Sequence, residues 1–233
     1  MPKTAWRMTE AGGPPPPRPY SPPSGFGRVV FEDDHLLVAD KPSGLLSVPG
    51  RGEARQDCLQ RRLEDLYGPL IAVHRLDMDT SGLIAFARTA EAGRALSSAF
   101  EARSVTKRYQ ALVHGVPAGT GGDIDLPIGR DWSMRPLRKV DIENGQPALT
   151  RWSLLAEDGA FALLDLMPQT GRTHQLRVHL QAAGHPICGD RLYGRPDGFQ
   201  TLCLHACRLA LPHPETATLI EFSSDADFTQ KAG

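Results

Sequence analysis

The sequence of 233 residues has no long apolar run and little cysteine. No stretch approaches the roughly 18 consecutive apolar residues that a membrane-spanning helix needs, so we expect no membrane partner. The N-terminus also lacks the charged start and apolar core of a signal peptide. The cysteines are too few and too unevenly spaced for a disulfide framework: Cys58, Cys188, Cys203 and Cys207. We therefore expect a cytoplasmic protein with reduced thiols.

Metal and cofactor signals are equally weak. There is no G-x-G-x-x-G or G-x-x-x-x-G-K-[ST] loop, so nothing favours a nucleotide cofactor. Cys203, His205 and Cys207 share one face of an expected strand, but without a C-x-x-C pair or a clear fourth ligand, core packing is favoured over zinc. His174 and His179 are about 140° apart around a helix, whereas a zinc pair is spaced four residues apart. The sequence predicts no metal and no cofactor.

The charges nearly cancel, with 26 basic and 27 acidic residues, so net charge neither predicts nor excludes a polyanionic partner. Their distribution is more informative, because the stretch 104–141 is rich in basic residues and "RPLRK" at 135–139 is a compact cluster. Taken alone, such a cluster is better explained as a solvated basic face. The basic residues of the stretch are Lys107, Arg108, Arg130, Arg135, Arg138 and Lys139.

Segments of strand character dominate the chain after a tail, residues 1–27, that is dense in proline and glycine and that we expect to be extended or disordered. Apolar or alternating segments predict two strands around the turn "EDD" at 32–34, followed by a loop at 41–50. Further strands are expected at 82–89, 107–115, 148–157, 160–167, 201–211 and 217–222. Many strands and few helices, without steady alternation, predict an α+β fold with a mixed, mostly antiparallel sheet flanked by helices and loops.

Three helices are expected. One spans about 57–66, where Leu59, Leu63 and Leu66 are spaced four and three apart. A second begins at Thr89 as N-cap, and its apolar residues are Ala92, Leu96, Ala99 and Phe100. In the third, Thr173 can cap the start and Gly184 can close the end.

The segment "VHRLDMDTSGL" at 73–83 places several charged residues between apolar residues that should be buried. Plain connections between buried elements usually read as polar turns, whereas His74, Arg75 and Asp77 stand beside core positions such as Leu76. We assign Asp79 to a turn. This layout is typical of a functional site.

A second candidate site element lies at 168–194. Gly171 and Arg172 precede the start of a helix, where free backbone N–H groups and the helix dipole favour an anion. If Arg172 faces Asp77, the guanidinium would hold that carboxylate ionised and aimed, as a nucleophile or base requires. The simpler alternative is that Asp77 only caps a turn and Arg172 only bridges strands.

Four ordered segments together resemble the RluA-type pseudouridine synthases: "HRLDMDTSGL" at 74–83, "KRYQALVHG" at 107–115, "TGRTHQLRVH" at 170–179 and "HPICGDRLYG" at 185–194. The resemblance spans about 28–223 and implies one catalytic domain over 28–225 without an S4 RNA-binding domain. "KPSGLLSVPGR" at 41–51 is similar to the short branch of the family, which modifies both 23S rRNA and the tRNA anticodon stem-loop.

The resemblance implies an isomerase, an intramolecular transferase that breaks the N1–C1′ bond of uridine and rejoins the base through C5, without a metal or a cofactor. A carboxylate is needed at the ribose, either as nucleophile toward C1′ or as base toward the sugar. Asp77 resembles that carboxylate, and Arg172 its orienting partner. Tyr109 resembles the residue that stacks on the uracil and helps proton removal at C5.

Since a uridine in structured RNA must leave its stack, something should fill the gap, and we expect Arg75 to do so. We expect the other RNA contacts to come from His74, Lys107, Arg108, Arg130, Arg135, Arg138 and Lys139, which makes binding sensitive to salt. The expected partner is RNA, 23S rRNA or tRNA or both, and not DNA, with the protein acting as a monomer.

Two other functions stay open on the sequence. A glycosidase would also place carboxylates at an anomeric carbon, and Asp77 with Asp79 invites that reading. However, only 6 % of residues are aromatic, and no groove for sugar stacking is evident. A non-catalytic RNA-binding module on the same fold would bind RNA without any dependence on Asp77.

Overall fold

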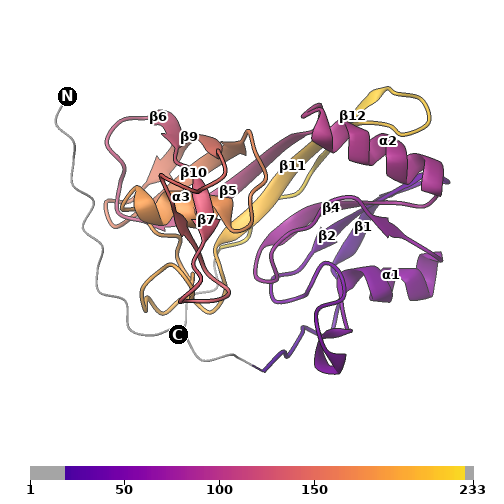
Figure 1. Cartoon of the computed structure of the whole chain (residues 1–233), viewed down its shortest axis with the longest axis horizontal. Coiled ribbons are helices and arrows are strands. Elements are labelled where there is room, and N and C mark those ends of the chain that lie inside the picture. Colours follow the sequence, from indigo (N-terminus) through magenta and orange to yellow (C-terminus); the bar gives the residue numbers. More distant parts are fainter. Residues whose placement is uncertain (1–18, 229–233) are drawn as a thin grey trace.

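The computed structural model describes residues 19–228, which form a ten-stranded sheet, a separate two-stranded hairpin and three α-helices (Figure 1). The helices are α1 (Leu59–Tyr67), α2 (Ala90–Glu101) and α3 (Gln175–Ala182), with a 3-10 turn η1 at Glu53–Arg55. The strands are β1 (Arg28–Glu32), β2 (Leu36–Lys41), β3 (Ile71–Ala72), β4 (Ser81–Ala87), β5 (Thr106–His114), β6 (Gly121–Asp125), β7 (Ile128–Arg130), β8 (Arg138–Val140), β9 (Leu149–Glu157), β10 (Phe161–Pro168), β11 (Leu204–Pro212) and β12 (Leu219–Ser223).

The large sheet runs in the order β1-β2-β4-β11-β5-β10-β9-β6, with β12 paired to β11 and β3 to β4. Its pairs are antiparallel except for the parallel pair of β4 and β11. The predicted α+β fold with a mixed, mostly antiparallel sheet is therefore confirmed. This order brings β4, which follows the segment 73–80, close to β5 and β11 in the middle of the sheet.

Strands β2 and β4 are covered on both faces, which explains their continuous apolar sequences. Successive side chains of a strand point to opposite faces. Leu36 and Val38 pack with residues of α2, whereas Leu37 and Ala39 pack with Leu59 of α1. Burial on both sides holds this half of the sheet rigid beneath the segment that carries Asp77.

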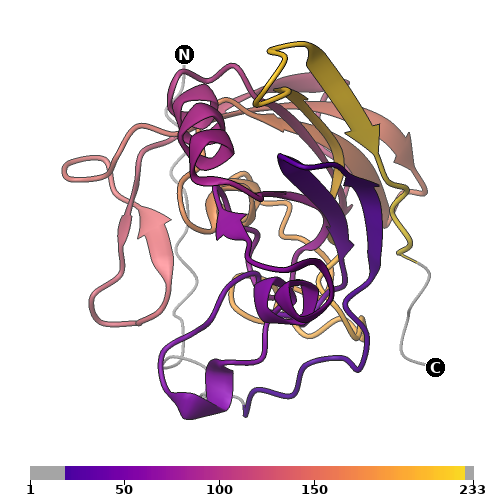
Figure 2. The ribbon, with the colours of Figure 1, turned by 90° about the vertical axis from the view of Figure 1, so that its right-hand side faces the viewer.

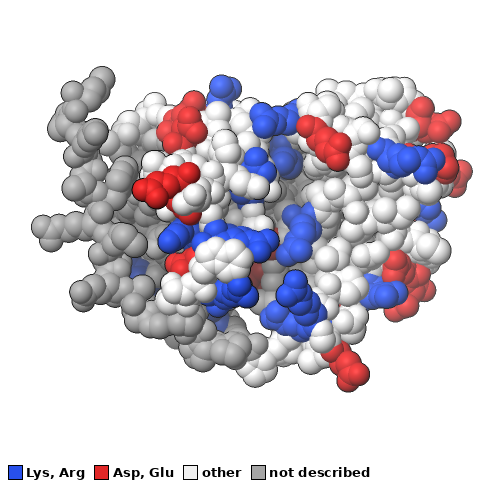
Figure 3. All heavy atoms as spheres, viewed as in Figure 1, with Lys and Arg blue, Asp and Glu red and all other residues white. Residues whose placement is uncertain are grey.

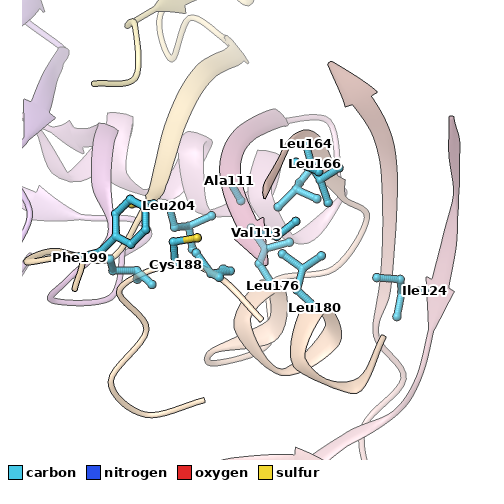
Figure 4. Close-up of a cluster of buried hydrophobic side chains, with 14 residues drawn as sticks. Ala111, Val113, Ile124, Leu164, Leu166, Leu176, Leu180, Cys188, Phe199 and Leu204 are labelled. Atoms are coloured by element: carbon cyan, nitrogen blue, oxygen red, sulfur yellow. The ribbon is translucent and has the colours of Figure 1, made fainter. Parts of the chain in front are cut away.

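The other half of the sheet packs against α3. Leu176 and Leu180 of α3 join Val113 of β5 and Leu164 and Leu166 of β10 in one buried cluster (Figure 4). In Figure 1, α3 lies in front of β5 and β10, and the β7–β8 hairpin lies in front of α3. Figure 2 shows the segment around β7 and β8 standing out from the body of the domain.

The helix predictions succeed in part. Thr89 caps α2, since its side chain accepts a hydrogen bond from the N–H of Ala92. Of the three leucines whose spacing predicts α1, Leu59 and Leu63 are buried but Leu66 is 63 % exposed, and Tyr67 and Leu70 supply the apolar contacts at that end of the helix. Thr173 is wrong as the N-cap of α3, where His174 holds that position with a φ of 58° and no capping side-chain bond.

The tail prediction covers 1–27, of which residues 1–18 lie outside the described residues. Residues 19–27 are held against the domain, contrary to the expected boundary. The Tyr20 hydroxyl donates to the carbonyl of Asp57 and accepts from the N–H of Leu46, and Arg62 donates to the carbonyls of Pro23 and Gly25. These bonds attach the end of the tail to α1 and to the loop after β2.

Candidate active site

Asp77 lies in a tight turn between β3 and β4. The N–H of Thr80 donates to the carbonyl of Asp77 at 3.2 Å, which closes a turn through Met78 and Asp79. The assignment of Asp79 to a turn is thus confirmed. The Asp77 side chain remains 20 % exposed, so its carboxylate is held by the protein and still accessible from a cleft.

The end of β2 and the loop that follows it hold this turn in place by hydrogen bonds. The ammonium group of Lys41, which is fully buried, donates to the carbonyls of Pro42, Leu45 and Met78 at 2.7–2.9 Å. The Ser47 hydroxyl donates to the carbonyl of Leu76 and accepts from its N–H. Burial lowers the pKa of Lys41 to about 7, although the nearby charges of Asp79 and Asp77 act in the opposite direction.

Gly82 at the start of β4 is required by the close approach of β11. Its φ is +106°, and a Cβ at this position would lie 2.4 Å from the carbonyl oxygen of Ala206. A side chain here would push β4 from β11 and displace the turn that precedes it. This contact explains a glycine within the segment 74–83.

The guanidinium that contacts Asp77 belongs to Arg177, not to Arg172. Nη1 of Arg177 lies 3.5 Å from Oδ2 of Asp77. Its Nε and Nη2 form a bidentate pair with Asp190 at 2.8 and 2.7 Å, and the guanidinium lies 5.1 Å from the ring centroid of Tyr193. Arg177 is only 3 % exposed, and Asp190 is fully buried. Asp190 therefore anchors the arginine that faces Asp77.

Arg172 occupies a different place. It lies in the turn before α3, where its N–H donates to Oε1 of Gln175 and its Nε donates to the carbonyl of Pro147 at 3.1 Å. The predicted pairing of Arg172 with Asp77 is therefore wrong in this structure, because the turn directs the guanidinium toward Pro147. Arg172 does line the same cleft as Asp77.

His174 adds a second contact to Asp77. Its Nε2 lies 3.9 Å from Oδ2 of Asp77, and its Nδ1 lies 2.6 Å from the Tyr193 hydroxyl. Burial lowers the pKa of His174 and raises that of Tyr193 to about 12, so both are neutral at pH 7. Tyr193 accepts the N–H of Arg138, and its own proton can be donated to Nδ1 of His174; in that tautomer the imidazole carries its proton on Nε2, the nitrogen nearer to Asp77.

Tyr109 of β5 faces the same cleft. Burial, followed by the charge of Asp77, raises the pKa of Tyr109, so its phenol stays protonated at neutral pH. Its ring is partly buried against two core clusters and is fixed by them. A ring held in this way beside a carboxylate can cover the face of a flat ligand.

Asp77 and Tyr109 open into a cleft of about 430 Å³ where the two halves of the sheet meet. Besides these two residues it is lined by His74, Arg75, Leu76, Thr80, Phe100, Glu101, Lys107, Pro168, Thr170, Gly171, Arg172, His174, Gln175, Leu176, Arg177 and Leu204. Figure 3 shows Lys and Arg side chains gathered around the hollow in the middle of this face. The cleft has the volume for a nucleotide and a positive rim.

The other residues expected at the site differ in placement. Arg75 is exposed at the cleft, and Lys107 lines it two residues before Tyr109 on the same strand face. His74 lines it as well, but its Nε2 accepts the N–H of Ala85, its ring stacks on Phe100 at 4.6 Å, and burial lowers its pKa to about 3.

Arg108 points to the opposite face of the sheet from Tyr109, as alternation along β5 requires. It forms a bidentate ion pair with Asp165 at 2.7–3.2 Å, and Asp165 is only 6 % exposed. The structure does not bring Arg108 to the cleft, because its guanidinium neutralises this acid on the far side of β5.

The basic cluster at 130–139 lies on the β7–β8 hairpin beside α3. Arg130, Arg135 and Lys139 are exposed, whereas Arg138 is half-buried. Burial is the main cause that lowers the pKa of His174, and the positive charge of Arg138 makes a smaller contribution in the same direction. Arg138 Nε is a buried nitrogen without a hydrogen-bond partner among residues 19–228. The hairpin therefore lies next to the residues that contact Asp77, through the hydrogen bond from the N–H of Arg138 to Tyr193.

The histidine and cysteine residues weighed for metal binding are engaged otherwise. Cys203 and Cys207 are buried in the core, as predicted, and both ring nitrogens of His205 lie within hydrogen-bond distance of serine hydroxyls. Another cluster could hold an ion by spacing, since ligand atoms of His114, Cys188 and Asp197 lie within 4.8 Å of one another. There, His114 Nε2 lies 2.7 Å from the Asp197 carboxylate.

Sequence reasoning missed Arg177, His174, Tyr193 and Asp190 as site residues. The signal was present in the segments "TGRTHQLRVH" and "HPICGDRLYG", because a charged Arg within an apolar helix requires a buried acid. Which acid this is depends on a contact across 13 residues. Spacing alone does not identify it.

Comparison with known proteins gives concordant results. Residues 35–182 match the family described as RNA pseudouridylate synthase. The chain is 43 % identical over 218 residues to a dual-specificity RNA pseudouridine synthase RluA of Vibrio vulnificus (strain CMCP6), covering 90 % of this chain and 87 % of that protein. It is 45 % identical over 215 residues to the protein of the same name from Escherichia coli (strain K12), covering 90 % and 98 %.

A similar fold occurs among solved structures. The structure of human RNA pseudouridylate synthase domain containing 1 superimposes with a TM-score of 0.75 at 29 % sequence identity, covering 88 % of this chain and 86 % of that one.

None of the helices within residues 19–228 is long and apolar enough to cross a membrane.

Proposed function

This chain belongs to the RNA pseudouridylate synthase family and is an isomerase of RNA uridine, and from that premise we propose that Asp77 is its catalytic carboxylate. One observation carries the proposal: Asp77 is accessible from the cleft, while Arg177 and His174 both contact Oδ2 of its carboxylate. A carboxylate at the ribose and a pocket for the free base are what the isomerisation needs.

Asp77 acts at the ribose by one of two routes. As a nucleophile, its oxygen bonds to C1′ while the N1–C1′ electron pair leaves with uracil, and C5 of the turned base later displaces the carboxylate. As a base, it removes the C2′ proton as uracil leaves, and the proton returns when C5 bonds to C1′. In both routes C5 loses a proton and N1 gains one, so the mass is unchanged. Deuterium at C2′ slows only the second route.

We propose that Arg177 and His174 are the groups that orient Asp77, in place of the Arg172 expected from the sequence. Arg177 Nη1 lies 3.5 Å and His174 Nε2 lies 3.9 Å from the same oxygen of Asp77, so both side chains can hold the carboxylate in one orientation. Asp190 fixes the arginine by two hydrogen bonds, so the guanidinium has little freedom to move toward the substrate. Asp77 is thereby aimed at the cleft.

Tyr109 is proposed to cover the uracil face and retain the detached base. Its raised pKa keeps the phenol protonated, so stacking is better supported than removal of the C5 proton. The Tyr109→Phe variant should therefore keep most of the activity that Tyr109→Ala loses.

RNA contacts are proposed around the rim. Arg75 is exposed beside Asp77 and can fill the place of the extruded uridine. Lys107 and Arg172 line the cleft and are proposed to contact the RNA backbone there. The exposed cluster of the hairpin, together with half-buried Arg138, is proposed to contact phosphates. Arg108 and His74 are not among these proposed contacts, because the guanidinium of Arg108 is bound to Asp165 and Nε2 of His74 accepts the N–H of Ala85.

We propose 23S rRNA and the tRNA anticodon stem-loop as substrates, with a role in rRNA and tRNA processing; the relatives' name, dual-specificity RNA pseudouridine synthase, supports more than one RNA substrate. We propose that the protein acts on these RNAs as a monomer, in the cytoplasm, and not on DNA. All four cysteines are buried, which supports a reducing compartment. Sedimentation tests whether the protein is a monomer. Activity on a DNA copy of the same stem-loop tests whether it acts on RNA alone.

The test uses tRNA and 23S rRNA labelled with tritium at uracil C5. Wild-type protein should release tritium, and Asp77→Asn should release none while binding the RNA with similar affinity. Asp65→Asn, an exposed acid on α1, is the matched control and should behave as wild type.

Two results would overturn the proposal. Binding without tritium release by wild type would indicate a non-catalytic RNA-binding module. Release of free uracil, instead of an RNA product of unchanged mass, would indicate a glycosidase.

A further inference from the structure

The loop between β7 and β8 carries an exposed indole between two arginines. Trp132 lies 4.5 Å from the Arg135 guanidinium and 5.5 Å from that of Arg130, measured to the ring centroid. Even with these contacts Trp132 is 63 % exposed. Cation–π contacts thus restrain the ring while most of its surface stays open to a ligand.

The loop that presents this ring is internally ordered. The Asp131 carboxylate accepts hydrogen bonds from the N–H groups of Ser133 and Met134 and from the Ser133 hydroxyl. The N–H of Asp131 donates to the carbonyl of Leu137, and that of Leu137 to the carbonyl of Met134. The indole is therefore displayed by a preformed loop, which lowers the entropic cost of binding.

The hairpin is also attached to the candidate active site. The N–H of Arg138 donates to the Tyr193 hydroxyl at 2.9 Å, Tyr193 contacts His174, and His174 contacts Asp77. Ile128 and Tyr193 share a buried cluster at the base of the hairpin. The indole thus has a fixed position relative to the carboxylate that acts on the ribose.

We propose that Trp132 is a stacking platform for an unpaired base of the RNA substrate, outside the pocket that receives the target uridine. The inference rests on the proposed function and adds a second base contact to it. Stacking on an aromatic ring accepts any base, and flanking guanidinium groups can hold the phosphates of the same nucleotide.

The chemistry of the surroundings favours RNA over a protein partner. Exposed Arg130 and Arg135 flank the ring, and exposed Lys139 lies on the adjoining strand β8, so three cations are available to phosphates. An acidic peptide would use these charges but not the open aromatic face. A nucleotide uses both at once.

The test measures RNA binding and turnover separately, on a stem-loop with tritium at C5 of its target uridine. Trp132→Ala should raise the Kd for RNA by about 5- to 100-fold, while kcat at saturating RNA stays within about threefold of wild type. Trp132→Phe keeps an aromatic face and should recover most of the affinity. Leu219→Ala, at a 68 % exposed apolar residue of β12, is the matched control and should bind as wild type.

Two further measurements distinguish stacking from a merely structural role. RNA should quench tryptophan fluorescence of wild type, and this component should be absent in Trp132→Phe. In stem-loops made abasic at one loop position at a time, the penalty of Trp132→Ala should vanish at the position whose base stacks. Equal affinity of wild type and Trp132→Ala, or a penalty unchanged by every abasic position, would overturn the platform. Absence of tritium release by wild type would instead overturn the proposed function.

Discussion

The pairing of Arg177 with Asp77 leads to a prediction that separates two arginines of one segment. Replacing Arg177 by Lys retains the positive charge but loses the planar fork that reaches both acids. The ammonium should stay with Asp190, which is fully buried and the closer partner at 2.7 Å. Asp77 then loses the cation that orients it.

The magnitude follows from the distance. Opposite charges 3.5 Å apart attract by about 5 kcal/mol at an effective dielectric constant of about 20. A carboxylate released from this pair must be reoriented before each turnover, which we expect to cost up to roughly 3–4 kcal/mol and so to lower kcat by about 100- to 1000-fold. Loss of one charge-assisted bond to Asp190 should also lower the free energy of unfolding by about 1.5–3 kcal/mol.

The assay is tritium release at saturating RNA, with urea denaturation to confirm that the variant is folded. Arg172→Lys should mainly raise KM, because Arg172 lines the cleft without an ion pair to Asp77 among the described residues. Arg94→Lys on α2, where exposed Arg94 pairs with exposed Glu91, is the neutral control. An equal fall in kcat for Arg172→Lys and Arg177→Lys, or an unchanged kcat in Arg177→Lys, would refute the reasoning.

Two other predictions concern stability. Lys41→Met removes the donor for three backbone carbonyls, so the free energy of unfolding should fall by about 2–5 kcal/mol in urea titrations, whereas Lys139→Met at an exposed position should leave it unchanged. Burial lowers the pKa of His74 to about 3, against about 6.5 in the unfolded chain, so the unfolded state binds an extra proton between these values. His74 should therefore reduce stability by up to about 1.4 kcal/mol per unit as pH falls from 6.5 toward 3. His74→Gln, which can still accept the N–H of Ala85, should lose this part of the slope, and an identical slope in urea titrations from pH 7 to 4 would contradict the assignment.

The sheet could be predicted where burial is two-sided. The apolar runs of β2 and β4 reflect contact with α1 on one face and α2 on the other, and such runs are visible in the sequence. In contrast, β6 with the sequence "GGDID" was missed, because four of its five residues are exposed and only backbone pairing with β9 makes it a strand. A strand that is held by backbone hydrogen bonds alone shows no alternation of apolar and polar residues in the sequence.

The candidate site shows the same limit more sharply. Asp77 stands out because charged residues interrupt an apolar context, and the structure confirms its place in an accessible turn. Its partner was misassigned because Arg172 precedes a helix, where local rules favour an anion.

Arg177, and not Arg172, contacts Asp77 because α3 is buried over most of its length. Every residue from Gln175 to Leu180 is buried, so a charge within this run must be neutralised inside the protein. Arg177 therefore needs an acid from elsewhere in the chain, and Asp190 supplies it with two bonds, leaving Nη1 for Asp77. An arginine buried within a helix is thus a better candidate for the partner of Asp77 than an arginine that precedes the helix N-terminus. Finding it requires that each buried charge be matched to an acid in a separate segment.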